Sequence, residues 1–159
     1  MAPGNLHLTL KFLGQVGEER IGPIVDALTR AVSSAKAFEA RFQGLGAFPS
    51  LTRPRVVWAG VTEGADQMVD LATRVDVALT ALGFAREARP FSPHATLGRV
   101  RQPGRNPALT DALQAAGGRE FGRNRIAGAS LMRSELSPRG ARYTELAALK
   151  LGGGVEPSV

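Results

Sequence analysis

The chain has 159 residues, 43% of them hydrophobic, and a net charge of +6, which indicates one compact domain with a substantial core rather than a disordered chain. It contains no cysteine, which excludes disulfides, thiolate catalysis and a cysteine-based zinc site. No apolar run approaches the roughly 18 residues that a membrane span needs, and the N-terminus lacks the features of a signal peptide. We therefore expect a cytoplasmic protein.

The first part of the chain is predicted to run strand, helix, strand, strand. Clean alternation of apolar and polar residues predicts a strand over about 5–13. Apolar residues at helical spacing predict a helix over about 19–34. Two further strands are expected near 37–45 and 55–61, joined by a loop that carries Gly, Pro and Ser.

A helix over about 65–82, ended by Gly83, is predicted to precede a second part with the same order. The elements of that part are a strand, a short helix and two strands, at about 92–100, 107–116, 125–135 and 142–151. The tail over 152–159 is predicted to be disordered.

The two parts form an internal repeat, about 5–61 and 92–151, and each opens with the same type of tetrapeptide. These tetrapeptides are HLTL at 7–10 and HATL at 94–97. The repeated order predicts an α+β fold with pseudo-twofold repeated strand–helix–strand–strand units.

Each tetrapeptide places a histidine and a threonine on one face of a strand, because residues i and i+2 point to the same side. The pairs are His7 with Thr9 and His94 with Thr96, and the protein has no other histidine. Opening a cyclic phosphodiester needs a base to activate water and an acid to protonate the leaving oxygen. Histidine suits both roles because its ordinary pKa is about 6.5.

Two alternative interpretations of these motifs stay open. A single H-x-T is more often a structurally bonded histidine than a catalytic one, but two copies that use every histidine favour catalysis. A zinc site is disfavoured, since two histidines fall short of the usual three or four protein ligands. The cyclic-phosphate scheme needs no metal, and the threonine hydroxyls with a nearby arginine can donate to phosphoryl oxygens.

The basic residues are nearly all arginine, which has a planar fork of donors that fits phosphate oxygens. Eleven of the arginines fall between Arg86 and Arg142, against four acidic residues. This imbalance is typical of a protein with an anionic partner such as RNA. A general compositional bias towards arginine explains it equally well.

Further candidate site residues follow from their positions in the predicted elements. Phe48 can stack on a nucleobase, although packing of its ring against the core is the simpler interpretation. Arg99 follows the second motif and is expected on the face of its histidine, near the phosphate. Arg133 and Arg139 are candidates for binding the RNA backbone, whereas Trp58 lies in an apolar run and is expected in the core.

NLHLTLKFLG at 5–14 and FSPHATLGRV at 91–100 resemble the paired signature strands of the 2H phosphoesterase superfamily. Within it, the resemblance is closest to the RNA 2′,3′-cyclic phosphodiesterases, also known as 2′-5′ RNA ligases, and the segments 48–61 and 131–151 are similar to other parts of that branch. The resemblance implies one two-lobed domain over 1–151, with antiparallel sheets flanking a central cleft to which each lobe contributes one motif.

The resemblance also implies the reaction: hydrolysis of a terminal 2′,3′-cyclic phosphate to a 2′-phosphate by cleavage of the ester to the 3′ oxygen. In that scheme His7 is the proton donor, His94 is the proton acceptor, and Thr9 and Thr96 bind phosphoryl oxygens. No cofactor or metal is implied. The implied partner is RNA with cyclic phosphate ends, tRNA fragments included, bound by a monomer that does not associate with membranes.

Some members of this branch also join RNA ends through 2′-5′ linkages, the reverse reaction. Two other functions remain open: a 2H phosphodiesterase for another cyclic or 2′-5′-linked nucleotide, and a non-enzymatic RNA-binding protein. Two intact H-x-T motifs argue against the latter, because binding alone needs no acid and base. Members usually begin with another strand and a long helix before the first motif, so we expect the natural protein to begin upstream.

Overall fold

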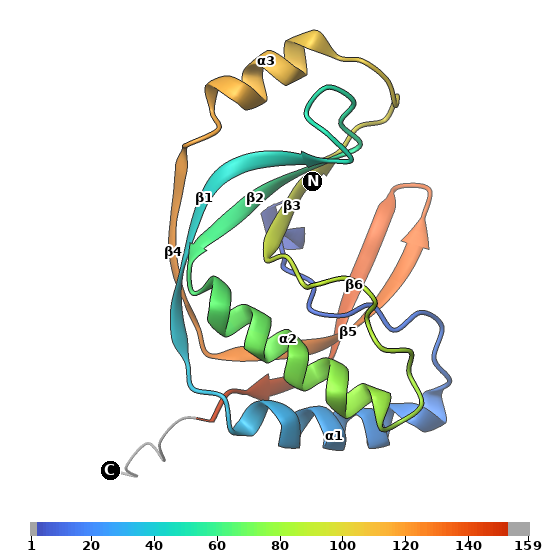
Figure 1. Cartoon of the computed structure of the whole chain (residues 1–159). Helices are drawn as coiled ribbons and strands as arrows, with labels where there is room; N and C mark the ends of the chain where they lie inside the picture. The colour runs from blue at the N-terminus through green and yellow to red at the C-terminus, as the bar shows by residue number, and fades with distance from the viewer. Residues whose placement is uncertain (1–2, 153–159) are drawn as a thin grey trace. The chain divides into compact units, whose positions relative to one another are not determined.

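The computed structural model describes residues 3–152, and Figure 1 shows the arrangement of its helices and strands. The helical elements are η1 (Pro3–Asn5), η2 (Glu18–Arg20), α1 (Ile21–Ser33), α2 (Ala65–Thr80) and α3 (Pro107–Ala115). The strands are β1 (Phe38–Phe48), β2 (Val56–Glu63), β3 (His94–Arg99), β4 (Glu120–Ile126), β5 (Gly128–Ser137) and β6 (Gly140–Lys150). Within the described residues, no helix is long and apolar enough to cross a membrane.

The chain divides into two compact units, each built from separate stretches of sequence. The first combines the residues up to Thr9 with Glu39–Met68 and Ser92–Asn124. The second combines Leu10–Phe38 and Val69–Phe91 with the residues from Arg125 onward.

A four-stranded sheet with the order β3-β2-β1-β4 forms the framework of the first unit. β2 is antiparallel to both β1 and β3. α3 belongs to the same unit, and its first turn is capped because the Asn106 side chain accepts a hydrogen bond from the N–H of Leu109 at 3.1 Å. Pro107, which has no N–H to satisfy, follows as the first helical residue.

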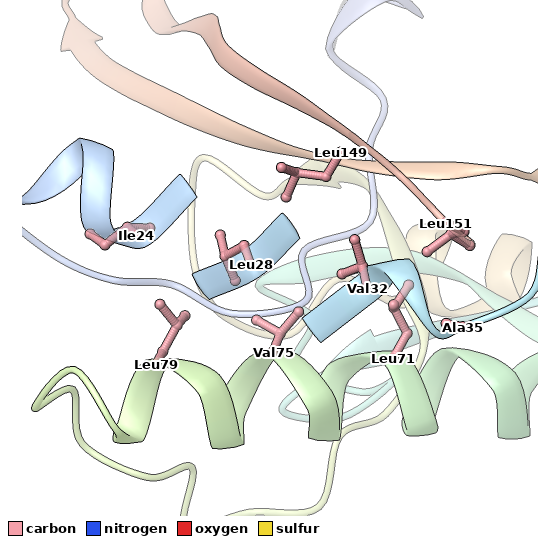
Figure 2. Packing of buried hydrophobic residues seen from close by; sticks show 9 residues of the cluster. All are labelled: Ile24, Leu28, Val32, Ala35, Leu71, Val75, Leu79, Leu149 and Leu151. Atoms are coloured by element: carbon pink, nitrogen blue, oxygen red, sulfur yellow. The ribbon is translucent and has the colours of Figure 1, made fainter. Parts of the chain in front are cut away.

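The second unit is organised around the apolar faces of α1 and α2 and the β5-β6 hairpin. Apolar side chains at helical spacing on both helices meet the end of β6 and the residues that follow it, as Figure 2 shows. This buried cluster comprises Ile24, Leu28, Val32, Ala35, Leu71, Val75, Leu79, Leu149 and Leu151. α2 ends at Thr80, and the turn that follows closes at Gly83, whose φ of +90° is a conformation that favours glycine.

The α+β class and the antiparallel sheets expected from the sequence are confirmed, but the strand predicted over 5–13 is wrong. The residues from Leu6 to Gly17 belong to neither sheet. A strand needs a neighbouring strand to hydrogen-bond its backbone, and alternation of side chains alone does not supply one. Alternation holds only over the first motif, where Leu8 and Leu10 are half-buried and His7 and Thr9 are exposed. It fails at Phe12, which is 77% exposed although alternation puts it on the side of Leu10.

The strand predicted over 125–135 is also corrected, since two strands, β4 and β5, share this region. Ala127 separates them, and the chain passes there from the four-stranded sheet to the hairpin. Of the tail predicted to be disordered, residues 153–159 lie outside the described residues.

Candidate catalytic site

The two histidines make the same local hydrogen bond. Nδ1 of His7 lies 2.7 Å from the carbonyl oxygen of Asn5, and Nδ1 of His94 lies 2.7 Å from the carbonyl oxygen of Ser92. A carbonyl oxygen can only accept, so in each ring Nδ1 carries the hydrogen. Each bond therefore fixes the neutral tautomer in which Nε2 is the basic nitrogen, the state that a proton-transferring histidine needs.

Both H-x-T motifs belong to the same compact unit, although they sit in different local structures. His7 and Thr9 lie in the exposed segment after η1, outside the sheets. His94 begins β3, an edge strand of the four-stranded sheet, and both His94 and Thr96 are half-buried. The side chains of both motifs, those of His7, Thr9, His94 and Thr96, therefore belong to one compact unit.

Arg99 shares a face of the sheet with His94 and Thr96, and a β-bulge is the reason. Arg99 is five residues after His94, so strict alternation would place it on the opposite face. The pairing of β3 with β2 shifts by one residue after Thr96, and this shift returns Arg99 to the face of His94. The three residues pair with alternate residues of β2: His94 with Gly60, Thr96 with Trp58 and Arg99 with Val56.

Two aromatic rings surround the imidazole of His94. The ring of Phe48, at the end of β1, lies 5.1 Å from the imidazole in an edge-on arrangement. The Trp58 ring lies 6.1 Å from the imidazole and 5.4 Å from the Phe48 ring. Phe48 is 41% exposed, so one of these rings offers a surface for stacking beside the histidine.

Trp58 does not lie in the core, contrary to the expectation from the apolar run that contains it. It is half-buried on the face of His94, and its indole occupies the space over Gly46, where a Cβ would stand 2.1 Å from the ring. Its Nε1–H is buried and, among the described residues, meets no acceptor. Sequence reasoning missed this pairing of Trp58 with Gly46, because only the register of β1 with β2 brings the two residues opposite each other.

Arg133 and Arg139 belong to the other compact unit. Arg133, on β5, is half-buried and forms an ion pair with Glu18. Arg139 lies exposed in the turn between β5 and β6, where its N–H donates to the Ser137 hydroxyl at 3.2 Å. Arg139 is thus exposed, while the Arg133 side chain is 40% exposed beside Glu18.

The histidines are not part of a larger group of metal-binding side chains in the described part of the chain. Across residues 3–152, no three histidine, aspartate or glutamate side chains converge to hold a metal ion. Around His94 lie the Thr96 hydroxyl, Arg99 and two aromatic rings, and the first motif contributes a second imidazole and hydroxyl to the same compact unit. An anion with an attached base, such as a nucleotide phosphate, matches these groups.

The fold and these paired motifs are those of a 2H phosphoesterase, and comparison with known proteins gives the family. A sequence model described as the 2′-5′ RNA ligase superfamily matches residues 3–137. The chain belongs to this superfamily. Among its relatives, the RNA 2′,3′-cyclic phosphodiesterase of Archaeoglobus fulgidus is 39% identical over 144 residues, which cover 91% of this chain and 78% of that protein. The protein of the same name from Methanothermobacter thermautotrophicus is 37% identical over 94% of this chain and 80% of its own length.

Solved structures agree with this assignment. The crystal structure of TT0787 of Thermus thermophilus is similar with a TM-score of 0.78 and 31% identity, over 98% of this chain and 82% of that one. The crystal structure of E. coli LigT complexed with 3′-AMP is similar with a TM-score of 0.72 and 25% identity, over 96% and 80% of the two chains.

Proposed function

We propose that this protein hydrolyses terminal 2′,3′-cyclic phosphates of RNA to 2′-phosphates. Its relatives of the same superfamily are named for this reaction on RNA. The observation that carries the proposal is the matched pair of histidines, each with Nδ1 bonded to the carbonyl two residues before it. A protein that only bound RNA would have no need of two imidazoles oriented for proton transfer.

In the proposed mechanism, His94 acts as the base and His7 as the acid. Nε2 of His94 takes a proton from water, whose oxygen attacks phosphorus while the bond from phosphorus to the 3′ oxygen breaks. Nε2–H of protonated His7 donates its proton to that 3′ oxygen, which leaves as a hydroxyl. The product is a 2′-phosphate monoester, and exchange of one proton with solvent restores both histidines.

The remaining candidates bind the substrate in this proposal. The hydroxyls of Thr9 and Thr96 donate to the two non-bridging phosphoryl oxygens, where negative charge increases in the transition state. Arg99 adds positive charge on the same face as His94. Phe48 stacks on the base of the terminal nucleotide, since its exposed ring lies beside the imidazole.

Contacts farther along the RNA complete the proposal. Arg133 and Arg139 bind the sugar–phosphate backbone. The natural substrates are RNA ends such as those of tRNA fragments, and the enzyme acts as a cytoplasmic monomer without a metal ion. If a 5′-hydroxyl of a second RNA replaces water as the nucleophile, the same groups form a 2′-5′ linkage.

The direct test is incubation with a short RNA that ends in a 2′,3′-cyclic phosphate, in the presence of EDTA. The product should be a 2′-phosphate, and His7→Ala and His94→Ala should each lose about 10²–10⁴ in rate, the typical contribution of one proton-transferring group. Circular dichroism of both variants checks that they are folded. A 3′-phosphate product, or activity that EDTA abolishes and zinc restores, would overturn the mechanism.

A further inference from the structure

Five arginines gather on two segments at one end of the four-stranded sheet. The loop between β1 and β2 carries Arg53 and Arg55, and the segment from the end of β3 to the start of α3 carries Arg99, Arg101 and Arg105. We call these five residues the loop arginines. All five are exposed, and neither segment contains an acidic residue.

Hydrogen bonds hold the two segments side by side. The N–H of Val100 donates to the carbonyl oxygen of Arg55 at 2.9 Å. The hydroxyl of Thr110, on α3, donates to the carbonyl oxygen of Leu51 at 2.7 Å. Figure 1 shows the two segments next to each other beside α3, so the positive charges belong to one region of the first unit.

The loop arginines have no acidic partner in the described part of the chain, whereas other arginines of the same unit do. Arg41 and Arg123 both form ion pairs with Glu63, at 3.1 Å in each case. None of the loop arginines forms an ion pair with any residue over 3–152. A concentration of unbalanced positive charge on one surface attracts a polyanion and repels a second cationic surface.

The position of this charge relative to His94 sets which part of a nucleic acid it can reach. Arg99 lies on the same face as His94, and their partners on β2 are four residues apart, a separation of roughly 13 Å along the strand. Arg101 and Arg105 follow beyond the end of β3, on the way to α3. A cyclic mononucleotide bound at His94 has no phosphate besides the one at the histidine, whereas an RNA chain has further phosphates upstream that these arginines can bind.

Phe48 connects the histidine with the arginine region. Its ring lies 5.1 Å from the His94 imidazole, and its carbonyl oxygen accepts a hydrogen bond from the N–H of Arg55 at 2.8 Å. An RNA strand whose terminal base stacks on Phe48 therefore continues towards residues that match its charge.

We propose that the loop arginines bind the phosphates of the RNA chain upstream of its cyclic end, and so make the enzyme prefer oligonucleotides to cyclic mononucleotides. This inference rests on the proposed function for the identity of the reaction at the histidines. It adds a second binding region and a substrate class, RNA chains of several nucleotides.

The test compares the wild type with a triple variant, Arg53→Gln, Arg101→Gln and Arg105→Gln. This variant keeps Arg99 and also Arg55, whose carbonyl oxygen bonds the two segments together. We expect kcat/KM for a hexaribonucleotide with a cyclic end to fall at least about 10-fold at low salt, while turnover of 2′,3′-cyclic AMP changes less than about 2-fold. The logarithmic salt dependence of hexanucleotide binding should become shallower by roughly 0.7 for each phosphate that the variant no longer binds, about 2 in total.

A matched control removes three exposed basic side chains from the other unit: Arg30→Gln, Lys36→Gln and Lys150→Gln. Binding of a fluorescent hexanucleotide with a 2′-phosphate end is measured separately by anisotropy, so that it does not depend on turnover. Equal weakening in both triple variants, or unchanged binding in the first, would overturn the inference. Selective weakening in the first without hydrolysis by the wild type would support it and overturn the proposed function alone.

Discussion

At the scale of single residues, the absent side chain of Gly46 decides where Trp58 lies. A Cβ on Gly46 would stand 2.1 Å from the indole ring, so Gly46→Ala must displace the ring or the strand. We expect this substitution to lower the free energy of unfolding by ~1–3 kcal/mol, the usual cost of overpacking. It should also lower the rate on cyclic-phosphate RNA, because the displaced indole lies 6.1 Å from His94. Urea denaturation and the cyclic-phosphate assay measure the two effects.

Gly98→Ala is the matched control for that prediction. Gly98 lies in β3 of the same sheet, and a Cβ there would meet no heavy atom within 4 Å. The substitution should therefore be close to neutral in the same denaturation experiment. If Gly46→Ala costs no more than Gly98→Ala, the packing argument is wrong.

The sequence predicted part of this residue-scale arrangement. Alternation is local, so it grouped His7 with Thr9, and both are exposed while Leu8 and Leu10 are half-buried. The bulge after Thr96 has no such local signal, because it depends on the pairing of β3 with β2. Arg99 was expected beside His94, yet the alternation rule by itself contradicts that expectation and only the bulge fulfils it.

At the scale of elements, a buried ion pair holds the segment that follows the first motif. The ammonium group of Lys11, with its side chain 4% exposed, lies 2.6 Å from Oδ1 of Asp76 on α2 and also donates to the carbonyl oxygen of Ala85 at 2.8 Å. These side-chain bonds hold the segment in place, since its backbone is not hydrogen-bonded to a neighbouring strand in either sheet. We expect Lys11→Met to lower the free energy of unfolding by ~2–4 kcal/mol, because among the described residues Asp76 then keeps only the exposed Arg86 as a charged partner, with its Nε 3.7 Å away.

An exposed ion pair on the same helix provides the comparison. Arg74 and Asp70 lie 2.7 Å apart on α2, with side chains 36% and 57% exposed. Asp70→Asn should cost no more than about 0.5 kcal/mol, as is usual for such surface pairs. Chemical denaturation of both variants measures the difference, and similar costs for the two would show that Lys11 is not a structural anchor.

The same ion pair predicts how stability depends on pH. The hydrogen bond from Lys11 lowers the pKa of Asp76 below its ordinary value of 3.8, and the N–H of Glu87 acts in the same direction, although burial opposes them. The folded chain therefore binds this proton less readily than the unfolded chain, and the stabilisation is complete at neutral pH. It is lost as the pH falls through the lowered pKa. The stability advantage of the wild type over Asp76→Asn should shrink from pH 5 to pH 2, and a constant difference would contradict this account.

The elements themselves were predictable to different degrees. The sequence correctly predicted α1 and α2, because each buries one apolar face and its periodicity is local. Strand membership depends on a partner elsewhere in the chain, so alternation over 5–13 predicted a strand where none forms. For the same reason, the change of sheet between β4 and β5 was not visible in the sequence.

At the scale of the whole molecule, the two compact units share elements. The boundaries between the units fall inside β1, α2 and β4, so each of these elements contributes residues to both. If one unit unfolded alone, the part of each shared helix or strand that belongs to the other unit would be left with exposed backbone hydrogen-bonding groups at its broken end. We therefore expect the units to unfold together, which is also what the single domain predicted over residues 1–151 requires.

Trp58 and Leu79 allow this cooperativity to be measured from the two units separately. Trp58 is the only tryptophan and belongs to the first unit, while Leu79 is fully buried in the cluster of the second. We expect Leu79→Ala to lower the free energy of unfolding by ~3–5 kcal/mol, the usual cost of a large-to-small change in a packed core. If the chain unfolds as one unit, the urea transition followed by Trp58 fluorescence moves together with the transition followed by far-ultraviolet circular dichroism. A fluorescence midpoint that stays at its wild-type value while the circular dichroism midpoint falls would mean that the two units unfold independently.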